Sequence, residues 1–265
     1  REIKSVNCVT RIVHDCKHNI STVTQPARHN QVCQRPHSRI WVSLTIDTDS
    51  SANLYGTMER AEFVLRHGIK AVEALVSLKA DPESLLREGW KLPARLFHLA
   101  TGGIHAFPIP ISRSKAPVRA QRIHKNELPQ IVCWPDDGGA FVTLPAVYSQ
   151  PPGTSWWKGW PASNMGMYRS QLNGNKYAED EVGLHYQIHR GLGIHHKEAL
   201  EKGVELPVNI VVGGPPSLAL SAVMPLPEGL PELAFAGVLG GRGVRICPGL
   251  NGLPLLAEAD FIIEG

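Results

Sequence analysis

Apolar residues recur at helical spacing in the first half of the chain. Along residues 55–67 they lie three or four positions apart, and Gly68 follows as a typical residue after a helix C-terminus. Pro82 suits the first turn of another helix, and Gly102-Gly103 ends a further periodic stretch. We therefore expect helices at residues 55–67, 71–79, 83–89 and 92–101, preceded by an alternating strand at residues 40–46.

The pattern changes after Pro117 to short apolar runs separated by turn residues such as Asn173-Gly174. Residues 208–212 should form a central, buried strand of the resulting sheet. The full prediction is strands at 130–134, 140–149, 183–188, 208–212, 244–247 and 261–263, with helices at 195–202, 217–223 and 230–239.

These elements predict an α/β (α+β) fold in two parts. A helix-bearing α/β region at residues 46–116 precedes a β-rich domain at residues 117–265, which we expect to form a barrel. The boundary falls in segment 108–119, which combines Pro and Ser with Lys and Arg in a linker-like composition.

Composition excludes several classes of protein. The longest apolar runs are about ten residues against the roughly 20 that a bilayer span needs, and no apolar signal-peptide core is visible, so we expect no membrane span. Five cysteines in 265 residues are typical of reduced thiols and indicate a cytoplasmic protein.

Residues 1–45 form a basic segment that matches no pattern we can assign. They contain seven Lys or Arg and two acids, within a chain whose net charge is +3. Without clustered basic runs or interleaved aromatic residues, a solvated surface segment is favoured over nucleic-acid binding. Cysteine and histidine residues here leave a zinc site as an alternative, although no C-x₂-C unit supports it: Cys8, Cys16, His18, Cys33 and His37.

Asn164, His185 and Glu232 supply an amide, an imidazole and a carboxylate. Such a mixed nitrogen and oxygen set suits Mn²⁺ or a similar divalent ion. Each residue also has a structural interpretation, as a turn residue, a hydrogen-bonded core histidine and an acid at a helix N-terminus, respectively. Their spacing alone does not decide between the two interpretations.

Two further features could bind anions. Gly213-Gly-Pro-Pro-Ser217 follows a predicted strand and opens a predicted helix, although its prolines remove two donors, so a plain strand–turn–helix corner remains the alternative. Arg169 could hold a substrate carboxylate through a bidentate contact, and its alternative is an ordinary surface arginine.

Five blocks in a fixed order resemble the UbiD family of decarboxylases, and the resemblance covers residues 50–265. The blocks are Cys133-Trp-Pro-Asp-Asp-Gly-Gly139, Asn164-Met-Gly-Met-Tyr-Arg169, Gly183-Leu-His-Tyr-Gln-Ile-His-Arg190, Gly213-Gly-Pro-Pro-Ser217 and Met224-Pro-Leu-Pro-Glu-Gly-Leu-Pro-Glu232.

The resemblance implies decarboxylation or carboxylation of aromatic or α,β-unsaturated carboxylic acids through prenylated FMN. It implies a flavin-binding split β-barrel in which Mn²⁺ and K⁺ hold the cofactor phosphate, and a substrate-side role for Arg169. It also implies a flavin prenyltransferase as cofactor supplier and a homo-oligomer. By position, the divalent-metal ligands are Asn164, His185 and Glu232, and the other cofactor-binding residues are Met165, Ser221, Ala222 and Met224.

One departure from the family concerns the catalytic acids. The family follows a strand similar to residues 260–265 with an acidic motif and a further domain, and neither has a counterpart in this sequence. We therefore expect a piece of a longer enzyme that is inactive by itself, with an apolar surface exposed. The alternative is a non-catalytic module that binds flavin or metal, or that serves assembly.

Overall fold

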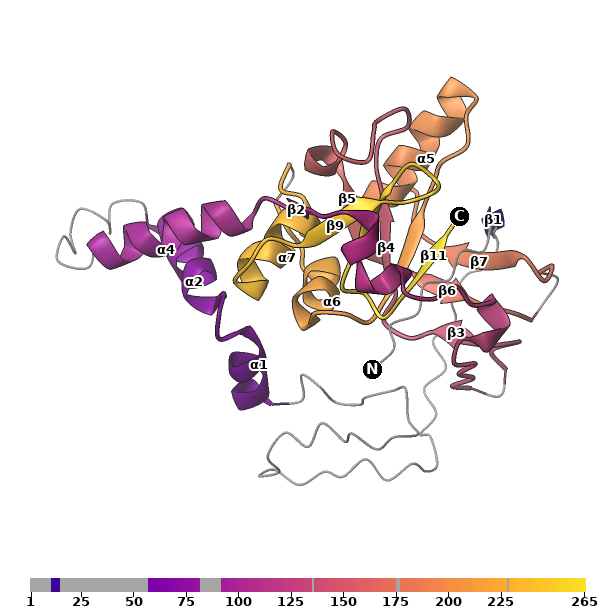
Figure 1. Ribbon diagram of the computed structural model, residues 1–265, viewed down its shortest axis with the longest axis horizontal. Helices are drawn as coiled ribbons and strands as arrows, with labels where there is room; N and C mark the ends of the chain where they lie inside the picture. The colour runs from indigo at the N-terminus through magenta and orange to yellow at the C-terminus, as the bar shows by residue number, and fades with distance from the viewer. Residues whose placement is uncertain (1–10, 15–56, 82–91, 135, 175–176, 228) are drawn as a thin grey trace.

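The computed structural model describes residues 11–14, 57–81, 92–134, 136–174, 177–227 and 229–265. The strand expected at 40–46, the helix expected at 83–89 and the candidate zinc ligands Cys8, Cys16, His18, Cys33 and His37 lie outside these ranges. Three helices from the first half of the chain extend to one side of the remaining structure (Figure 1). They are α1 (Met58–Leu65), α2 (Ile69–Ala80) and α4 (Leu92–His105), close to the helices expected from the sequence.

A four-stranded antiparallel sheet forms the centre of the structure. It contains β4 (Ala146–Ser149), β5 (Asn164–Met167), β8 (Asn209–Val212) and β11 (Phe261–Glu264), in the order β11-β8-β4-β5. β8 lies between two partner strands, and its Ile210 and Val211 are buried. The expected central, buried strand is therefore confirmed.

Two further sheets flank the central one. The first has the order β1-β7-β6-β3 and the second the order β10-β9-β2. The strands of the first are β1 (Arg11–His14), β3 (Phe141–Val142), β6 (Arg169–Gln171) and β7 (Glu181–His185); those of the second are β2 (Ile109–Pro110), β9 (Arg245–Pro248) and β10 (Pro254–Leu256). The mixed helix and sheet class is confirmed, whereas a split barrel stays a prediction.

Two strand predictions were wrong. Residues 130–134 contribute only an isolated bridge between Ile131 and Phe141. The expected strand at 140–149 is divided into β3 and β4, because Leu144 adopts a positive φ of 50° immediately before Pro145, which has no amide donor. Strands β1, β2, β5, β6 and β10 were not predicted, since their sequences are short and lack clear alternation.

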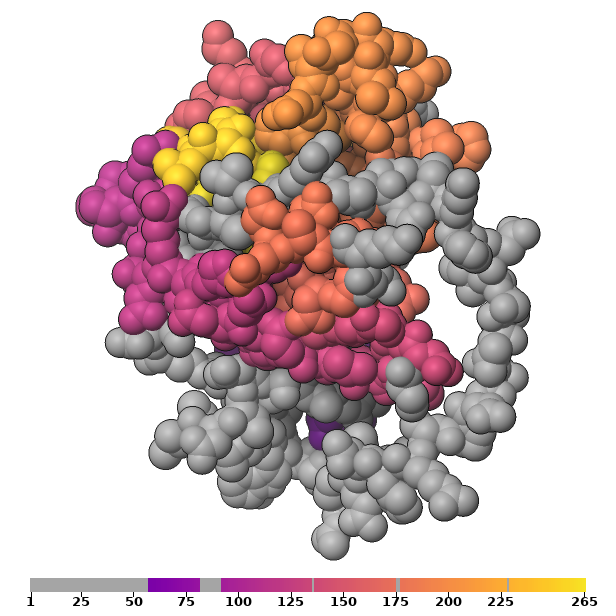
Figure 2. Space-filling model, turned by 90° about the vertical axis from the view of Figure 1, so that its right-hand side faces the viewer, coloured from indigo at the N-terminus to yellow at the C-terminus, as the bar shows by residue number. Residues whose placement is uncertain are grey.

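Three helices in the second half cover the central sheet. They are α5 (Gly191–Lys202), α6 (Pro216–Val223) and α7 (Glu232–Gly240). α5 starts four residues before the helix expected at 195–202, and it forms the upper end of the molecule in both views (Figure 1, Figure 2). α7 is buried on nearly every face and packs against α6, α4 and α2, so its run of apolar residues is a core helix.

Segment 108–119 packs into the fold. Ile109 N–H donates to Val244 O (2.8 Å) as β2 joins β9, and Val118 N–H donates to Ala257 O (3.1 Å). Ala116 and Val118 belong to the main hydrophobic cluster. The division of the chain into domains at this segment stays a prediction.

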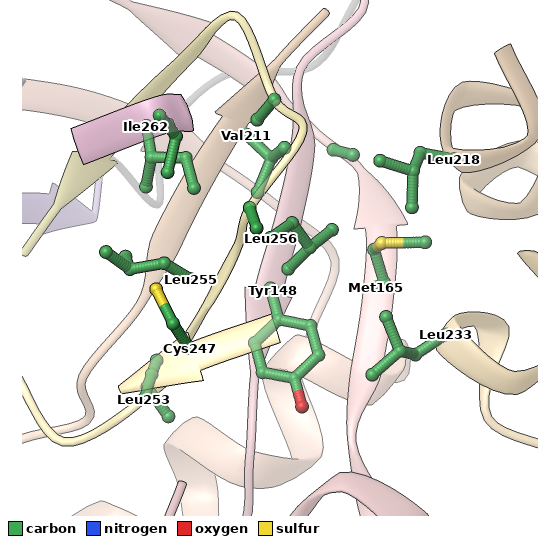
Figure 3. Close-up of a cluster of buried hydrophobic side chains, with 14 of the residues drawn as sticks. Tyr148, Met165, Val211, Leu218, Leu233, Cys247, Leu253, Leu255, Leu256 and Ile262 are labelled. Atoms are coloured by element: carbon green, nitrogen blue, oxygen red, sulfur yellow. The ribbon is translucent and has the colours of Figure 1, made fainter. Parts of the chain in front are cut away.

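The main hydrophobic cluster lies between the central sheet and helices α6 and α7. Tyr148 and Met165 come from neighbouring strands, with Leu218 of α6 and Leu233 of α7 on one side (Figure 3). The hydroxyl of Tyr148 accepts a hydrogen bond from Gln150 Nε2 (2.8 Å), and burial raises the pKa of this phenol to about 12. The cluster fixes β5 against both helices, and thereby positions the site described next.

Candidate functional site

The chain passes from one sheet to another within the block Asn164–Arg169. β5 pairs with β4 in the central sheet, whereas β6 pairs with β7 and β3, and only Tyr168 separates the two strands. Asn164 therefore stands at the outer strand of the central sheet, and Arg169 at the beginning of the neighbouring sheet. This junction carries the candidate site.

Asn164 is held between Tyr168 and the start of α5. Its Nδ2 donates to the Tyr168 hydroxyl (3.4 Å), and a Cβ added at Gly191 would lie 2.1 Å from Asn164 Oδ1. Burial raises the pKa of the Tyr168 phenol, and hydrogen bonds from Asn164 and the Leu192 amide oppose that rise. Glycine at position 191 is thus required for the close approach of this amide to the helix.

Glu232 begins α7 and reaches the strand that carries Asn164. Its Oε2 accepts a hydrogen bond from the Met165 amide (3.0 Å). Burial raises the pKa of this half-buried carboxyl, although the amides of Met165 and of Glu232 itself oppose the rise. Among the described residues no Lys, Arg or His forms an ion pair with it. A buried carboxylate without a counter-charge is a favourable ligand for a cation.

His185 is the last residue of β7 and is exposed. It stands opposite Arg169 in the β6–β7 register, so it belongs to the neighbouring sheet. The next residue, Tyr186, packs its ring edge-on against Tyr168, with 6.4 Å between centroids. The end of β7 therefore lies against the same tyrosine that contacts Asn164, while no hydrogen bond within the described ranges joins the His185 imidazole to Asn164 or Glu232.

Arg169 is paired in the structure. Its Nη2 lies 2.8 Å from Asp137 Oδ1, and its guanidinium carbon lies 4.1 Å from the centroid of the Phe141 ring. The Asp137 side chain is 9% exposed, and its Oδ2 accepts the Trp134 amide (3.1 Å). A substrate carboxylate would therefore have to compete with Asp137 for this guanidinium.

Ser221, Ala222 and Met224 lie at the end of α6. Ser221 is buried and donates its hydroxyl to Ser217 O (2.7 Å), Ala222 packs against the main hydrophobic cluster, and Met224 is exposed. α6 packs against β5 and α7, the elements that carry Asn164 and Glu232. The last carbonyl groups of a helix lack helical partners and carry partial negative charge, so they suit a cation.

The block Gly213-Gly-Pro-Pro-Ser217 behaves as a strand–turn–helix corner. Both glycines have positive φ, and Gly214 N–H donates to Asp260 Oδ2 (3.1 Å). The carboxylate of Asp260 thus occupies the position at which an external anion would meet this turn. This observation favours the structural interpretation of the block.

The sequence analysis missed residues that support the site from within. His195 is buried on α5, where its Nδ1 lies 2.9 Å from Ser149 Oγ, and burial lowers the pKa of this imidazole. Tyr186 hydrogen-bonds His196 Nδ1. Tyr168 and Tyr186 had a sequence signal, because they lie inside the blocks Asn164–Arg169 and Gly183–Arg190, whereas His195 and His196 had none.

Two cavities lie elsewhere. One of about 230 Å³ lies between α1, α6 and α7, and another of about 460 Å³ lies beside residues 113–120. Within the described ranges no cluster of three or more His, Cys, Asp or Glu could hold a metal; the candidate set offers two such residues together with an asparagine.

Comparison with known proteins identifies the family. The family profile described as "3-octaprenyl-4-hydroxybenzoate carboxy-lyase Rift-related domain" (UbiD) matches residues 110–265. A protein of Chlamydia pneumoniae, named as a subunit of 4-hydroxybenzoate decarboxylase, is 33% identical over 219 residues, covering 80% of this chain and 34% of its own length. An uncharacterized protein of Chlamydia muridarum is 38% identical over 220 residues, which cover 80% of this chain and 35% of that protein. The chain therefore belongs to the UbiD family of carboxy-lyases.

Solved structures of the same class share the fold. Vanillic acid decarboxylase of Sedimentibacter hydroxybenzoicus in its closed form has a TM-score of 0.54 at 23% identity, over 61% of this chain and 34% of its own. Apo 3,4-dihydroxybenzoic acid decarboxylase of Klebsiella pneumoniae has a TM-score of 0.54 at 19% identity, over 80% of this chain and 40% of its own. An evolved dimeric form of HmfF from Pelotomaculum thermopropionicum, in complex with prFMN, has a TM-score of 0.51 at 22% identity, over 63% of this chain and 40% of its own.

This chain spans about a third of the length of the curated relatives that it matches. None of the helices in the described ranges is both long and apolar enough to cross a membrane.

Proposed function

We propose that the protein containing this chain interconverts an aromatic or α,β-unsaturated carboxylic acid and its decarboxylated product by means of prenylated FMN. Membership of a carboxy-lyase family supports the reaction type, and the prFMN complex of HmfF supports the cofactor. The observation that carries the proposal is the half-buried carboxylate of Glu232, which has no cationic partner among the described residues and contacts the strand bearing Asn164.

The cofactor would supply the electron sink that no side chain offers when CO₂ leaves an sp² carbon. The chain would supply the ligands. Asn164 Oδ1, the His185 imidazole and the Glu232 carboxylate would bind Mn²⁺ or a similar ion beside the cofactor phosphate. Met165 and the α6 C-terminus, with Ser221, Ala222 and Met224, would contact the phosphate and K⁺.

Arg169 would orient the substrate carboxylate. A guanidinium can form two parallel hydrogen bonds with a carboxylate, and it stays charged at all relevant pH values. Its present partner Asp137 presents the same chemical group, so substrate binding would exchange one carboxylate for another. Asp137 would thereby keep the guanidinium oriented toward the site in the absence of substrate.

A second candidate function is a non-catalytic module that binds flavin or metal, or that serves assembly. The pairing of Arg169 with Asp137 favours it, because a guanidinium held by a stable internal partner has no need of a substrate. If the first proposal, the decarboxylase, is correct, the enzyme would depend on a flavin prenyltransferase as cofactor supplier and would act as a homo-oligomer.

The test is CO₂ release by the whole protein that contains this chain, loaded with prenylated FMN and offered hydroxybenzoate-like and cinnamate-like acids. We expect turnover, and Arg169→Lys should reduce kcat/KM by about a hundredfold, because the bidentate contact is lost. Arg66→Lys, an exposed arginine on the distant α1 side, serves as control and should leave kcat/KM unchanged. Flavin binding without turnover on any of these acids would favour the non-catalytic module.

A further inference from the structure

A basic cavity opens beside two short 3₁₀ turns, η2 (Arg113–Lys115) and η3 (Pro117–Arg119). Its volume is about 460 Å³, within the range of roughly 300–1,000 Å³ that is usual for small-molecule sites. Its charged lining residues are Arg113, Lys115 and Arg119, and its lining contains no acid. None of the residues of the proposed cofactor site lines it.

The backbone around this cavity is fixed by the core. Ala116 and Val118 are buried in the main hydrophobic cluster, and Val118 N–H donates to Ala257 O (3.1 Å). Lys115 precedes Ala116 and Arg119 follows Val118, so both side chains project from a backbone that the core holds in place. Such a support lowers the entropic cost of binding a ligand.

The two arginines are in different hydrogen-bonding states. Arg113 donates from Nε to Pro248 O (3.0 Å) and from Nη2 to Gly249 O (2.9 Å), so two backbone carbonyls orient its guanidinium. In contrast, Nη1 of Arg119 is buried and has no hydrogen-bond partner. A buried donor of a charged group without an acceptor is unfavourable, and a ligand acceptor that reached this nitrogen would remove the cost.

Arg113 and Arg119 both line the same cavity. Burial raises the pKa of the Cys247 thiol on β9, and the charges of Arg119 and Arg113 both oppose the rise, whereas Glu264 adds to it. Glu264 Oε1 accepts the Leu250 amide (2.6 Å), and Glu264 is not among the residues that line the cavity. Two neighbouring guanidinium groups repel one another, which a bound anion would relieve.

We propose that this cavity binds a small phosphate-bearing molecule, with Arg119, Arg113 and Lys115 contacting its phosphate. A phosphomonoester carries a charge of about −1.5 to −2 near neutral pH, which matches a cluster of three cations better than a single carboxylate does. Its three terminal oxygens can accept from both guanidinium groups at once. The site is separate from the proposed cofactor site, and it stands whether or not the chain binds flavin.

The test is a titration of the 265-residue chain with inorganic phosphate and with glycerol phosphate at constant ionic strength, followed by NMR of arginine Nε–Hε groups. We expect saturable shifts of the Arg119 and Arg113 signals. Arg119→Met should weaken binding about tenfold or more, because it removes charged hydrogen bonds. Lys115→Met, which alters only an exposed side chain, should weaken binding several-fold without affecting the fold, and the exposed control Lys158→Met should change nothing.

Three results would overturn the proposal. They are the absence of saturable shifts, shifts of equal size with succinate or with added chloride, and equal weakening by Lys158→Met and Lys115→Met. Glu232→Gln separates this site from the cofactor site, since it should leave phosphate affinity unchanged. Loss of phosphate binding in that variant would assign the phosphate to the cofactor site and contradict the proposal.

Discussion

The half-buried carboxyl of Glu232 affects the stability of the fold, and its proposed role as a cation ligand would explain why it is there. Its carboxyl is half-buried, its pKa is raised by desolvation, and its partners are backbone amides. For an acid with a raised pKa in the folded state, the contribution to stability is fully present below the unfolded pKa. That contribution is lost as the pH rises through the folded pKa. At neutral pH the ionised carboxylate therefore destabilises the metal-free chain.

Replacing Glu232 with Gln should consequently stabilise the metal-free chain at neutral pH. It should also remove part of the fall in stability that occurs as the pH rises above 4.5. The measurement is the thermal unfolding midpoint between pH 4 and 8, with Glu205→Gln at an exposed position as the matched control. Mn²⁺ should reverse the order, because only the wild-type carboxylate gains from a bound cation. A variant less stable than the wild type at neutral pH without metal would contradict this explanation.

The candidate metal ligands could not be predicted from the distances that separate them along the sequence. Asn164, His185 and Glu232 are far apart along the chain, and only the family resemblance linked them. The pairing of Arg169 with Asp137 was not foreseen, although both residues lie in recognised blocks, because nothing in a sequence tells which acid meets which base. The buried Nη1 of Arg119 likewise has no sequence signature, since its burial depends on how η3 packs.

At the scale of elements, Lys125 joins two segments of the chain. It is 1% exposed, and its Nζ donates to the carbonyls of Leu172 (3.0 Å), Ala178 (3.2 Å) and Glu181 (2.5 Å). It thereby fixes the end of β6 to the start of β7, the two strands that carry Arg169 and His185. The site depends on this connection because β6 and β7 set the spacing of those side chains.

Lys125→Met should destabilise the fold by about 2–4 kcal/mol, because three carbonyl groups lose their donor. Lys197→Met is the control: Lys197 forms an exposed pair with Glu201 at 3.8 Å, and its loss should change stability by less than about 0.5 kcal/mol. Urea unfolding measures both. A destabilisation of equal size in the two variants would show that the buried ammonium contributes nothing specific.

Elements with a clear period could be predicted, and those without one could not. Helices α1, α2, α4, α6 and α7 and strands β8, β9 and β11 follow from their apolar patterns. β5 and β6 escaped prediction because Asn164–Arg169 alternates neither in period two nor in period 3.6. The chain changes sheet in that block, and the crossing is set by tertiary packing around Met165 and Tyr168.

At the scale of the whole molecule, the N-terminal helices display apolar side chains to solvent. Phe63 of α1 is 55% exposed, Phe97 of α4 is 64% exposed, and Phe107 just after α4 is also 64% exposed. The sequence analysis expected a large exposed apolar surface. Individual exposed phenylalanines do not establish a continuous apolar patch, so the large apolar surface stays a prediction.

The 265-residue chain by itself should show no decarboxylation, even with prenylated FMN supplied. In the proposed function Arg169 orients the carboxylate, whereas the family resemblance assigns proton transfer to acids outside residues 1–265, and a well-placed general acid contributes about 10²–10⁴-fold. Product formation from hydroxybenzoate-like and cinnamate-like acids is the measurement. Turnover by this chain that disappears in Arg169→Ala would show that another carboxylate performs the proton transfer.

The central claim is that Asn164, His185 and Glu232 form one cation site, and Mn²⁺ bound to the chain tests it most directly. Electron spin echo measurements on the Mn²⁺-loaded chain should reveal one bound ion coupled to an imidazole nitrogen. The coupling should vanish in His185→Gln, and the affinity should fall about tenfold or more in Glu232→Gln, because a charged ligand is lost. Mn²⁺ that binds without a nitrogen coupling, or that binds equally well in both variants, would contradict the assignment of these three residues to one site.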